Sequence, residues 1–559
     1  MSTLTARLVQ ACEHDLGMKT PSSMPDARQL SYTEFASQYF LYNLVRKLEP
    51  WEEKADVPKE VLQASLEKFV DTEWRCTVIN RHGRFYSPID ETKRAFFREA
   101  IRLARSWISR TTMDRWPAWS DARYTSGASV ETERKQSMSY LKWAGHSQSG
   151  AMSATTAALH IVTNYIAPEY GPSWAYARVK RCDHSRFDFV SKTAKAVRFM
   201  AMEAEYNMLA QKCVGDCIRG SLLEVGYNLN AQTLNQELAR WASISQNQGT
   251  VDMSNSSDNH ALRLHEMLLP ERLWHYCVTT RTPNIAVDGV KHKLEKTASM
   301  GNGFIFELQS LIYAGLAHAA TQLTGGRESD IAVYGDDIIV STQTVEPFLE
   351  LLEYLGMEPN WEKSYWGDTP FRESCGTHWY AGRDVTPFYV KEPLGTLATR
   401  FRALNGIDYW SERTGIALPT ARRLLIAAID RRDRVVVPKT WSITSGLHFL
   451  CSGCKPPTRR VAHGEIYYRQ KALTEPVIDI RDRLDDEVLY RDWLASPPEY
   501  YVEPSVFHRL DALRKRRDPR GFVASYGCPR ERKAYSSVWD SASCSMLWAE
   551  REFRLGDAS

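Results

Sequence analysis

Two adjacent acidic residues stand where their neighbours favour a rigid hairpin. Asp336 and Asp337 belong to the run Ile331-Ala-Val-Tyr-Gly-Asp-Asp-Ile-Ile-Val340, in which apolar β-forming residues flank the Gly-Asp-Asp tripeptide. This pattern predicts two short strands with two carboxylates at the tip of their turn. Adjacent acids at a turn often only face water, but apolar strands of this kind are buried and hold the turn in place. Paired carboxylates on a rigid turn suit a divalent metal ion.

A third acid, Asp252, interrupts another β-forming run. Thr250, Val251 and Met253 around it suit a strand. A carboxylate inside a buried strand is costly unless it is paired or binds a metal ion. If this strand lies beside the 331–340 hairpin, the three acids converge and can hold two metal ions. The predicted chemistry is nucleotide transfer, in which a 3′-hydroxyl attacks an α-phosphate and pyrophosphate leaves.

Short polar residues accompany a glycine-rich turn. The segment reads Ala298-Ser-Met-Gly-Asn-Gly-Phe-Ile-Phe-Glu307, and apolar residues at helical spacing predict a helix directly after it. Ser299 and Asn302 could recognise a ribose hydroxyl. The alternative is that they only cap the helix, and the motif by itself does not decide between the two.

Two stretches carry cations that suit a nucleotide. Lys192, Lys195 and Arg198 recur every three residues, and such a group can bind a triphosphate and offset its charge in the transition state. Lys363 follows a predicted helix that Gly356 ends, and a lysine there could donate a proton to departing pyrophosphate. For both stretches, an ordinary solvent-exposed basic surface is the alternative.

Helices and short strands must position these motifs. Apolar residues at three- and four-residue spacing predict further helices over Thr92–Arg110, over 206–225 with Gly226 as its cap, and over 345–355. Short strands mix with helices from 249 to 390, and the chain beyond 391 is helical and loop-rich. Since 559 residues exceed one compact core, we expect several domains of an α+β fold.

The composition is that of an ordinary globular protein, with 43% hydrophobic and 25% charged residues. A net charge of +3 neither requires nor excludes a nucleic-acid partner. The N-terminus lacks the apolar segment of a signal peptide, and no run of 18 apolar residues occurs. We therefore expect no membrane span, and a reducing cytoplasm in which the 11 cysteines are free thiols.

Two further motifs give weaker predictions. Cys451-Ser-Gly-Cys454, with His448 and His463 nearby, suggests zinc only weakly, because a lone Cys-x-x-Cys lacks the spacing of a complete four-ligand site. The basic run Leu513-Arg-Lys-Arg-Arg-Asp-Pro-Arg520 is either an RNA contact or a solvated face.

The order of the motifs carries more information than any one of them. A basic stretch, a strand acid, a Ser-Met-Gly-Asn-Gly turn, a Tyr-Gly-Asp-Asp hairpin and a lysine follow one another, in a series that resembles that of right-hand RNA-dependent RNA polymerases. The motifs also resemble those of the replicase β subunits of the leviviruses, the single-stranded RNA phages of the Qβ type. The matching segments are Gln232–Gln236, Ser299–Phe304, Phe306–Leu308, Tyr334–Ile339, Phe371–Gly376 and Asp384–Tyr389.

The resemblance implies an α+β right-hand polymerase fold with fingers, palm and thumb. An antiparallel palm sheet would carry the Gly-Asp-Asp hairpin. On this basis, residues 1–240 comprise the N-terminal region and fingers with the basic NTP-binding stretch. Residues 241–390 form the palm with the catalytic motifs, and residues 391–559 form the thumb and C-terminal region.

The resemblance also implies roles for individual residues. Asp252, Asp336 and Asp337 would hold two Mg²⁺ ions, for which Mn²⁺ could substitute, and Lys363 takes the proton-donor position. The residues expected to bind the ribose and the triphosphate are Asp258, Ser299, Asn302, Lys192, Lys195 and Arg198. The turn expected to grip the primer strand comprises Phe371, Arg372, Glu373, Ser374, Cys375 and Gly376.

The implied activity is replication of a single-stranded RNA phage genome from NTPs in the cytoplasm of an infected bacterium. Family analogy adds the host elongation factors Tu and Ts and a ribosomal protein as partners, beside template and product RNA. One alternative is a reverse transcriptase, which usually has Ala or Met where Gly335 stands and a bulky aromatic against the ribose 2′-hydroxyl. The other is an RNA-binding protein with an inactive palm, against which the complete set of acids and cations argues.

Overall fold

The computed structural model describes most of the chain before residue 452 and less beyond it. The described residues are 3–49, 56–123, 128–131, 148–150, 152–166, 179–193, 195–287, 289–437, 439, 441–451, 453–454, 458–462, 465–472 and 530–532. They fall into two compact units. Unit 1 takes the described residues of Met1–Asp56, Asp384–Asp482 and Phe507–Ser559, and unit 2 takes those of Val57–Arg383.

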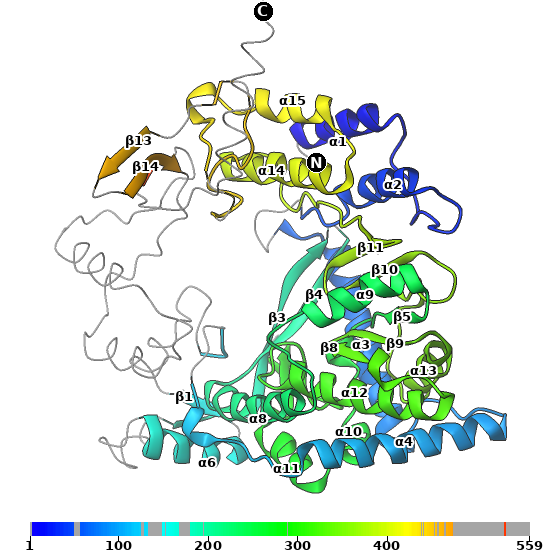
Figure 1. Cartoon of the computed structure of the whole chain (residues 1–559). Helices are drawn as coiled ribbons and strands as arrows, with labels where there is room; N and C mark the ends of the chain where they lie inside the picture. The colour runs from blue at the N-terminus through cyan, green and yellow to red at the C-terminus, as the bar shows by residue number, and fades with distance from the viewer. Residues whose placement is uncertain are drawn as a thin grey trace, which may run out of the picture. The chain divides into compact units, whose positions relative to one another are not determined.

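Unit 2 is organised around one almost fully buried helix, α12 (Ile305–Thr324). Its helical neighbours are α4 (Glu91–Thr112), α8 (Glu205–Glu224) and α13 (Thr342–Tyr354), and Figure 1 shows α12 among them. Because each helix repeats its apolar residues at three- and four-residue spacing, their apolar faces join in one core. The helices predicted from periodicity are confirmed, with Gly226 at positive φ just beyond α8.

A three-stranded antiparallel sheet packs on α12. Its strand order is β5-β9-β8, with β5 (Gln248–Val251), β8 (Ala332–Tyr334) and β9 (Asp337–Ser341). The predicted hairpin is confirmed, and so is the prediction that the strand before Asp252 lies beside it, since Val251 pairs with Ile338. The strands are buried, so the acids stand at the end of a rigid element.

A separate four-stranded sheet in unit 2 carries the basic stretch. Its order is β4-β3-β6-β7, and its strands are β3 (His184–Thr193), β4 (Ala196–Met202), β6 (Asn284–Val287) and β7 (Val290–Lys293). The β3–β4 pairing is antiparallel, with an irregularity between Ser191 and Thr193. Lys192 lies at that irregularity, near the end of the hairpin.

The remaining helices are α1 (Thr3–Leu16), α2 (Tyr32–Leu44), α3 (Lys59–His82), α6 (Met152–Ile161), α9 (Thr233–Ser245), α10 (Leu262–Leu268), α11 (Glu271–Thr280), α14 (Leu397–Thr414) and α15 (Pro419–Ala427). The remaining strands are β1 (Gln148–Gly150), β2 (Val179–Arg181), β10 (Phe371–Ser374), β11 (Thr377–Tyr380), β12 (Arg383–Asp384), β13 (Thr458–Ala462), β14 (Glu465–Ala472) and β15 (Arg530–Arg532). This mixture of helices and mainly antiparallel sheets confirms the predicted α+β class.

Unit 1 joins the start of the chain to its later part. The helices α1, α2, α14 and α15 share one apolar core, in which the Phe40 and Trp410 rings lie 4.2 Å apart, and Figure 1 shows these helices in blue and yellow. The Asp15 carboxylate accepts backbone N–H bonds from Thr420 and Ala421 at the start of α15. Such a bond satisfies donors that a helix N-terminus leaves free.

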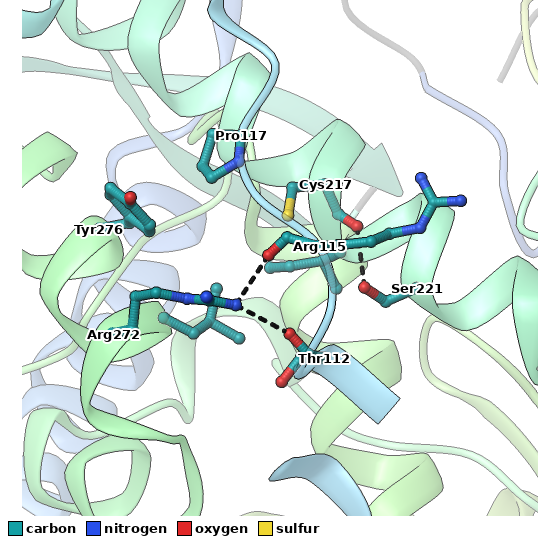
Figure 2. Close-up of a pocket in the computed structure, with 9 residues that line it drawn as sticks. Thr112, Arg115, Pro117, Cys217, Ser221, Arg272 and Tyr276 are labelled. Carbon is teal, nitrogen blue, oxygen red and sulfur yellow. Dashed lines mark hydrogen bonds between the residues drawn. The ribbon is translucent and has the colours of Figure 1, made fainter. Parts of the chain in front are cut away.

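Arg272 of α11 ties down the C-terminal end of α4. Its guanidinium donates to the carbonyl oxygens of Thr112, Met113 and Arg115 at 3.2, 2.9 and 2.9 Å, and it stacks on the Trp116 ring. Figure 2 shows the small pocket at this junction. None of the predicted site residues lines it, and Arg272 in its wall satisfies carbonyl oxygens at the end of a helix. We therefore interpret the pocket as a feature of helix packing and not as part of the candidate site.

Among the described residues, Cys451, Cys454 and His448 belong to no group of three or more side chains that could hold a metal ion. The two sulfur atoms lie 2.7 Å apart, and His448 Nδ1 pairs with the Tyr409 hydroxyl at 2.8 Å. His463 and the basic run 513–520 lie outside the described residues. Within the part of the chain that is described, no helix is long and apolar enough to cross a membrane. The fingers, palm and thumb boundaries stay a prediction.

Candidate active site

The turn that carries Asp336 depends on Gly335. The turn between β8 and β9 has only two residues, and Gly335 has a φ of 63°. A Cβ atom there would lie 2.6 Å from a ring carbon of Phe306 on α12, so a larger residue would collide. The Gly335 N–H donates to the Ser310 hydroxyl of α12 at 3.0 Å. A glycine-first turn suits the twist of a hairpin, and α12 fixes its tip.

Asp337 opens β9, and a second hairpin holds its carboxylate. β10 and β11 join through Cys375 and Gly376, whose φ values are 48° and 72°. The Cys375 N–H donates to Asp337 Oδ1 at 2.9 Å, and Ser374 Oγ donates to the same oxygen at 3.3 Å. Positive φ is costly for a residue with a Cβ atom, and at Cys375 it directs an N–H at the acid.

Two side chains of α9 join both hairpins. Asn235 Nδ2 donates to the Asp337 carbonyl oxygen at 3.0 Å, and Gln236 Nε2 donates to the Cys375 carbonyl oxygen at 3.1 Å. Both residues belong to the Gln232–Gln236 motif, which carries a family resemblance and for which no role was predicted. The structure supplies a role, because these bonds fix Asp337 relative to the turn that holds it.

Arg372 uses its guanidinium entirely inside the protein. It is fully buried and donates to four backbone carbonyl oxygens at 2.6 to 3.1 Å, and burial lowers its pKa to about 10. Phe371 and Ser374 are also buried, Glu373 is half-buried, and Gly376 is exposed. Most of the predicted primer-grip turn therefore supports the acid site, and only its exposed end is free to meet a nucleic-acid strand.

Asp252 follows β5 directly, one residue beyond the strand that was predicted to contain it. Its Oδ2 atom accepts a hydrogen bond from Asn360 Nδ2 at 2.9 Å and lies 3.4 Å from Lys363 Nζ. The Asn360 N–H donates to the Asp252 carbonyl oxygen at 2.9 Å. The segment after α13 thus fixes Asp252 from its backbone and from its side chain, and it brings the predicted proton donor to the acids.

The acids act on one another electrostatically. Burial raises the pKa of Asp337 to about 7, and the negative charges of Asp336, Asp252 and Glu373 add to that rise. Burial also raises the pKa of Asp252, against the positive charge of Lys363. Glu373, which was predicted only as part of the primer grip, therefore contributes a fourth negative charge to this group.

The donor set fits a divalent cation. Asp336 and Asp337 form no ion pair within the described residues, so their charge is not balanced by the protein. No group of three or more His, Cys, Asp or Glu side chains among those residues already converges on one point, since protein donors hold the carboxylates of Asp252 and Asp337. Carboxylate oxygens are ligands that Mg²⁺ prefers. Asp336 and Asp337 would hold it together with Asp252, which also pairs with Lys363.

Asp258 ends a short 3-10 turn and is paired with a buried lysine. Lys296 Nζ lies 2.8 Å from Asp258 Oδ1 and 3.0 Å from Glu73 Oε1 of α3. The lysine side chain is fully buried, and its ammonium lies 3.7 Å from the Phe69 ring centroid. Sequence patterns pointed to Asp258 and gave no sign of its partner.

Tyr313 of α12 connects the Asp258 turn to the acids. Its hydroxyl lies 2.9 Å from the Ser256 hydroxyl, which belongs to the same turn as Asp258. Burial raises the pKa of Tyr313, and the negative charges of Asp336 and Asp252 contribute to the rise. The predicted ribose contact and the predicted metal ligands therefore border the same tyrosine.

The glycine-rich loop Ser299–Gly303 is clamped between β4 and α8. The Ala201 N–H donates to the Met300 carbonyl oxygen at 2.9 Å. Gly301 has a φ of 109°, and a Cβ atom there would lie 2.3 Å from the Ala201 carbonyl oxygen. Gln211 Oε1 accepts the N–H of the last loop glycine at 3.0 Å. Close backbone approach therefore requires glycine at position 301, and hydrogen bonds to both neighbouring elements hold the loop in place.

Ser299 and Asn302 differ in the hydrogen-bond partners that the protein supplies to their side chains. The Ser299 hydroxyl is buried and has no hydrogen-bond partner among the described residues, which is costly unless a ligand completes it. Asn302 Oδ1 accepts the Phe304 N–H at 2.9 Å, at the entry to α12. Its buried Nδ2 has no hydrogen-bond partner among the described residues. The capping alternative thus describes part of what Asn302 does.

The β3–β4 hairpin brings cations to Asp252. The Lys192 side chain is exposed in surface area, yet neighbouring atoms partly desolvate its ammonium and lower its pKa to about 8. The positive charges of Arg198 and Lys363 lower this pKa further, and Asp252 raises it. Lys195, at the tip of the hairpin, is exposed. Lys192, Arg198 and Lys363 are therefore close enough to act on one another, beside Asp252.

Three residues of the site had escaped the sequence analysis: Lys296, Glu203 and Asn360. Each is a single polar residue with a partner on a segment distant in sequence: Asp258 for Lys296, Thr282 for Glu203 and Asp252 for Asn360. The one available signal was that each is a charged or amide residue near a recognised motif. Many surface residues have that property too, so the signal could not single these three out. Their roles exist only because separate segments meet.

The chain matches the family described as "RNA replicase, beta-chain" over residues 4–552. It is 41% identical over 253 residues to the RNA-directed RNA polymerase subunit beta of Enterobacteria phage SP, which covers 45% of this chain and 43% of that protein. The corresponding subunit of Escherichia virus Qbeta is 38% identical over 251 residues, covering 45% and 42%. The matched part is thus less than half the length of these two relatives.

A longer match joins the chain to the RNA-directed RNA polymerase beta chain of Enterobacteria phage GA, at 32% identity over 358 residues, covering 63% of this chain and 66% of that one. Among solved structures, the BmCPV RNA-dependent RNA polymerase in its elongation state gives a TM-score of 0.37 at 10% identity, covering 59% of this chain and 32% of that one.

Proposed function

The chain belongs to the RNA replicase beta-chain family, and from that premise we propose that it is an RNA-directed RNA polymerase that replicates the genome of a single-stranded RNA phage. The observation that carries the proposal is the group formed by Asp252, Asp336 and Asp337. Their carboxylates stand at one end of a buried antiparallel sheet. Asp252 is paired with Lys363, whereas Asp336 and Asp337 have no ion pair among the described residues.

Two Mg²⁺ ions, or Mn²⁺ in their place, are the proposed cofactors. Bound there, they would lower the pKa of the attacking 3′-hydroxyl and stabilise charge on the leaving pyrophosphate. The protein's own part is to present oxygen ligands and keep them in place. Gly335 and Ser310 fix the hairpin tip, and the Cys375 N–H orients Asp337.

The proposed nucleotide site borders these acids. Lys192, Lys195 and Arg198 would bind the triphosphate, for which the positive group beside Asp252 gives support. Lys363, close to Asp252 in the structure, would donate a proton to pyrophosphate. Asp258, Ser299 and Asn302 would contact the ribose, and the buried Ser299 hydroxyl without a protein partner supports this for one of them.

The proposed partners follow from the family. They are template and product RNA, NTPs, the host elongation factors Tu and Ts, and a ribosomal protein. The proposed place of action is the cytoplasm of an infected bacterium. For the division of labour, we propose fingers within 1–240, palm within 241–390 and thumb within 391–559.

The test is Mg²⁺-dependent incorporation of labelled ribonucleotides on an RNA template by the purified chain, with and without bacterial extract. Asp336→Asn should abolish incorporation. Glu362→Gln, which changes an exposed carboxylate outside the acid group, should leave it unchanged. Incorporation only with extract would favour host partners. RNA binding without incorporation in any mixture would contradict the polymerase and favour an inactive palm, and a preference for deoxyribonucleotides would favour a reverse transcriptase.

A further inference from the structure

The buried Lys296 pairs with only one of the carboxylates predicted to contact substrate, Asp258. Its ammonium is fully buried and lies 2.8 Å from Asp258 Oδ1 and 3.0 Å from Glu73 Oε1. Burial alone would lower the pKa of Lys296, but the charges of these two carboxylates outweigh it, and the pKa is raised. The lysine therefore stays charged, and a buried charge of this kind orients whatever it pairs with.

The segment that carries Lys296 is fixed from several sides. The Arg281 guanidinium donates to the carbonyl oxygens of Leu294, Lys296 and Thr297 at 3.0, 2.9 and 3.2 Å. The Thr297 N–H donates to the His260 carbonyl oxygen at 2.7 Å. The lysine backbone is held in this way, and its buried ammonium is held by the two carboxylates and the Phe69 ring. The Lys296–Asp258 pair therefore has a set position.

The pairing leaves half of the Asp258 carboxylate available. Lys296 engages Oδ1, and within the described residues no donor engages Oδ2. The side chain keeps 12% of its surface exposed, so one oxygen can accept a hydrogen bond from a small ligand group such as a hydroxyl. A carboxylate free on both sides would rotate, whereas this one is held by its other oxygen.

We propose that Lys296 is a positioning residue for substrate selection: it holds the Asp258 carboxylate in one orientation, so that Oδ2 accepts the ribose 2′-hydroxyl and deoxyribonucleotides are rejected. This inference rests on the proposed polymerase function and on the ribose role of Asp258. A site built to hydrogen-bond a hydroxyl rejects a substrate without it, because its polar group is then left unpaired. That rejection requires a fixed acceptor, and Lys296 fixes it.

The measurement is the ratio of kcat/KM for a ribonucleotide to that for its 2′-deoxy analogue, in Mg²⁺, on one RNA template with bacterial extract present. Lys296→Met should lower the ratio by about ten- to a hundredfold, mainly by loss of ribonucleotide use. Glu73→Gln is the matched control, because it disturbs the same buried cluster and leaves the Lys296–Asp258 bond. It should keep the ratio within about twofold of wild type.

A double-mutant comparison tests whether Lys296 acts through Asp258. Asp258→Asn alone and Asp258→Asn with Lys296→Met should give the same ratio, because removing the lysine has no further effect once the carboxylate is gone. If Lys296→Met alone does not fold, Glu73→Gln with Lys296→Met removes one charge of each sign and leaves Asp258 without its lysine. This pair should show the same loss of selectivity.

The outcomes separate the inference from the proposed function. If Lys296→Met slows both nucleotides equally and the ratio is unchanged while Asp258→Asn lowers it, the lysine is only structural and the inference is overturned. If Asp258→Asn leaves the ratio unchanged, the inference is overturned together with the ribose role, although RNA synthesis by the wild type would still support the polymerase. A wild type without any synthesis overturns the proposed function and the inference with it.

Discussion

Two groups of carboxylates lie on neighbouring elements of unit 2, and they differ in what balances their charge. Asp258 and Glu73 share a fully buried lysine. Asp336 and Asp337 have no ion pair among the described residues, and burial and mutual repulsion raise the pKa of Asp337 to about 7. Tyr313 connects the two groups. The charges of Asp336 and Asp252 raise its pKa, and its hydroxyl is hydrogen-bonded to Ser256 in the turn of Asp258.

This difference indicates that the charge of the Asp258–Glu73 group has a structural role and that the charge of the Asp336–Asp337 group has a functional one. A buried carboxylate with a lysine partner is already stabilised, so the protein loses stability when the partner is removed. A buried carboxylate without a partner destabilises the fold and persists because a ligand balances it. The first group should therefore respond to mutation mainly in stability and selectivity, and the second mainly in activity.

The largest expected effect is on the unbalanced group. Asp336→Asn and Asp337→Asn should each lower RNA synthesis by about a thousandfold or more, because a metal-binding carboxylate is lost. The check is incorporation of labelled ribonucleotides in Mg²⁺, with circular dichroism to show that the variants fold. Variants that keep more than a tenth of the activity would contradict the proposed metal site.

Stability should change in opposite directions in the two groups. Lys296→Met should destabilise unit 2 by roughly 3–5 kcal/mol, because it leaves the buried Asp258 and the half-buried Glu73 without their lysine. Asp337→Asn should stabilise it at pH 8, by roughly 1–4 kcal/mol. The sign follows because the pKa of Asp337 is raised on folding to about 7, so the charged form weakens the fold as pH rises through that value. Denaturant unfolding at pH 5 and pH 8 checks both, and equal behaviour of the two variants would break the comparison.

Metal binding should depend on pH in the unbalanced group. With Asp337 titrating at about 7 in the metal-free protein, a cation must displace a proton below that pH. The apparent Mg²⁺ affinity should therefore fall by about tenfold per pH unit from pH 7 to pH 6 and change little above pH 8. Calorimetric Mg²⁺ titration at three pH values measures this, and a flat profile would contradict the raised pKa.

The turn that holds Asp337 should be sensitive to backbone conformation. Cys375 has a φ of 48°, which a β-branched side chain resists. Cys375→Val should lower activity by about tenfold through misplacement of Asp337, whereas Cys375→Gly, which adopts this φ freely, should keep it. Comparing kcat of the two variants tests the backbone role. Equal loss in both would assign the effect to the sulfur atom.

The smallest expected effect concerns the basic hairpin. With Lys192 titrating near 8, the free enzyme loses a positive charge above that pH, and KM for NTPs should rise several-fold between pH 7.5 and pH 9. Lys192→Arg should move this rise to higher pH, since arginine stays charged. A rise that persists unchanged in the arginine variant would point to another group.

Much of the site could be read from local pattern because its parts are local. The Ile331–Val340 hairpin and the helices at 92–110 and 206–225 each fold from their own apolar spacing, and the structure confirms them. Asp252 was found although it lies one residue beyond its strand. The segment Phe371–Gly376 was predicted as a primer grip, which stays a prediction. The burial of Arg372 was not predicted, because a sequence does not show which carbonyl oxygens will need a donor.

The sequence by itself determined the acids, the hairpin that carries two of them and the family, because these follow from neighbouring residues and the order of motifs. Only the tertiary structure decided which charges are balanced. Lys296 meets Asp258 across 38 residues and Glu73 across 223, and Cys375 reaches Asp337 from another hairpin. Coulomb energies depend on distance and burial in space, and neither is written in the spacing of residues along the chain.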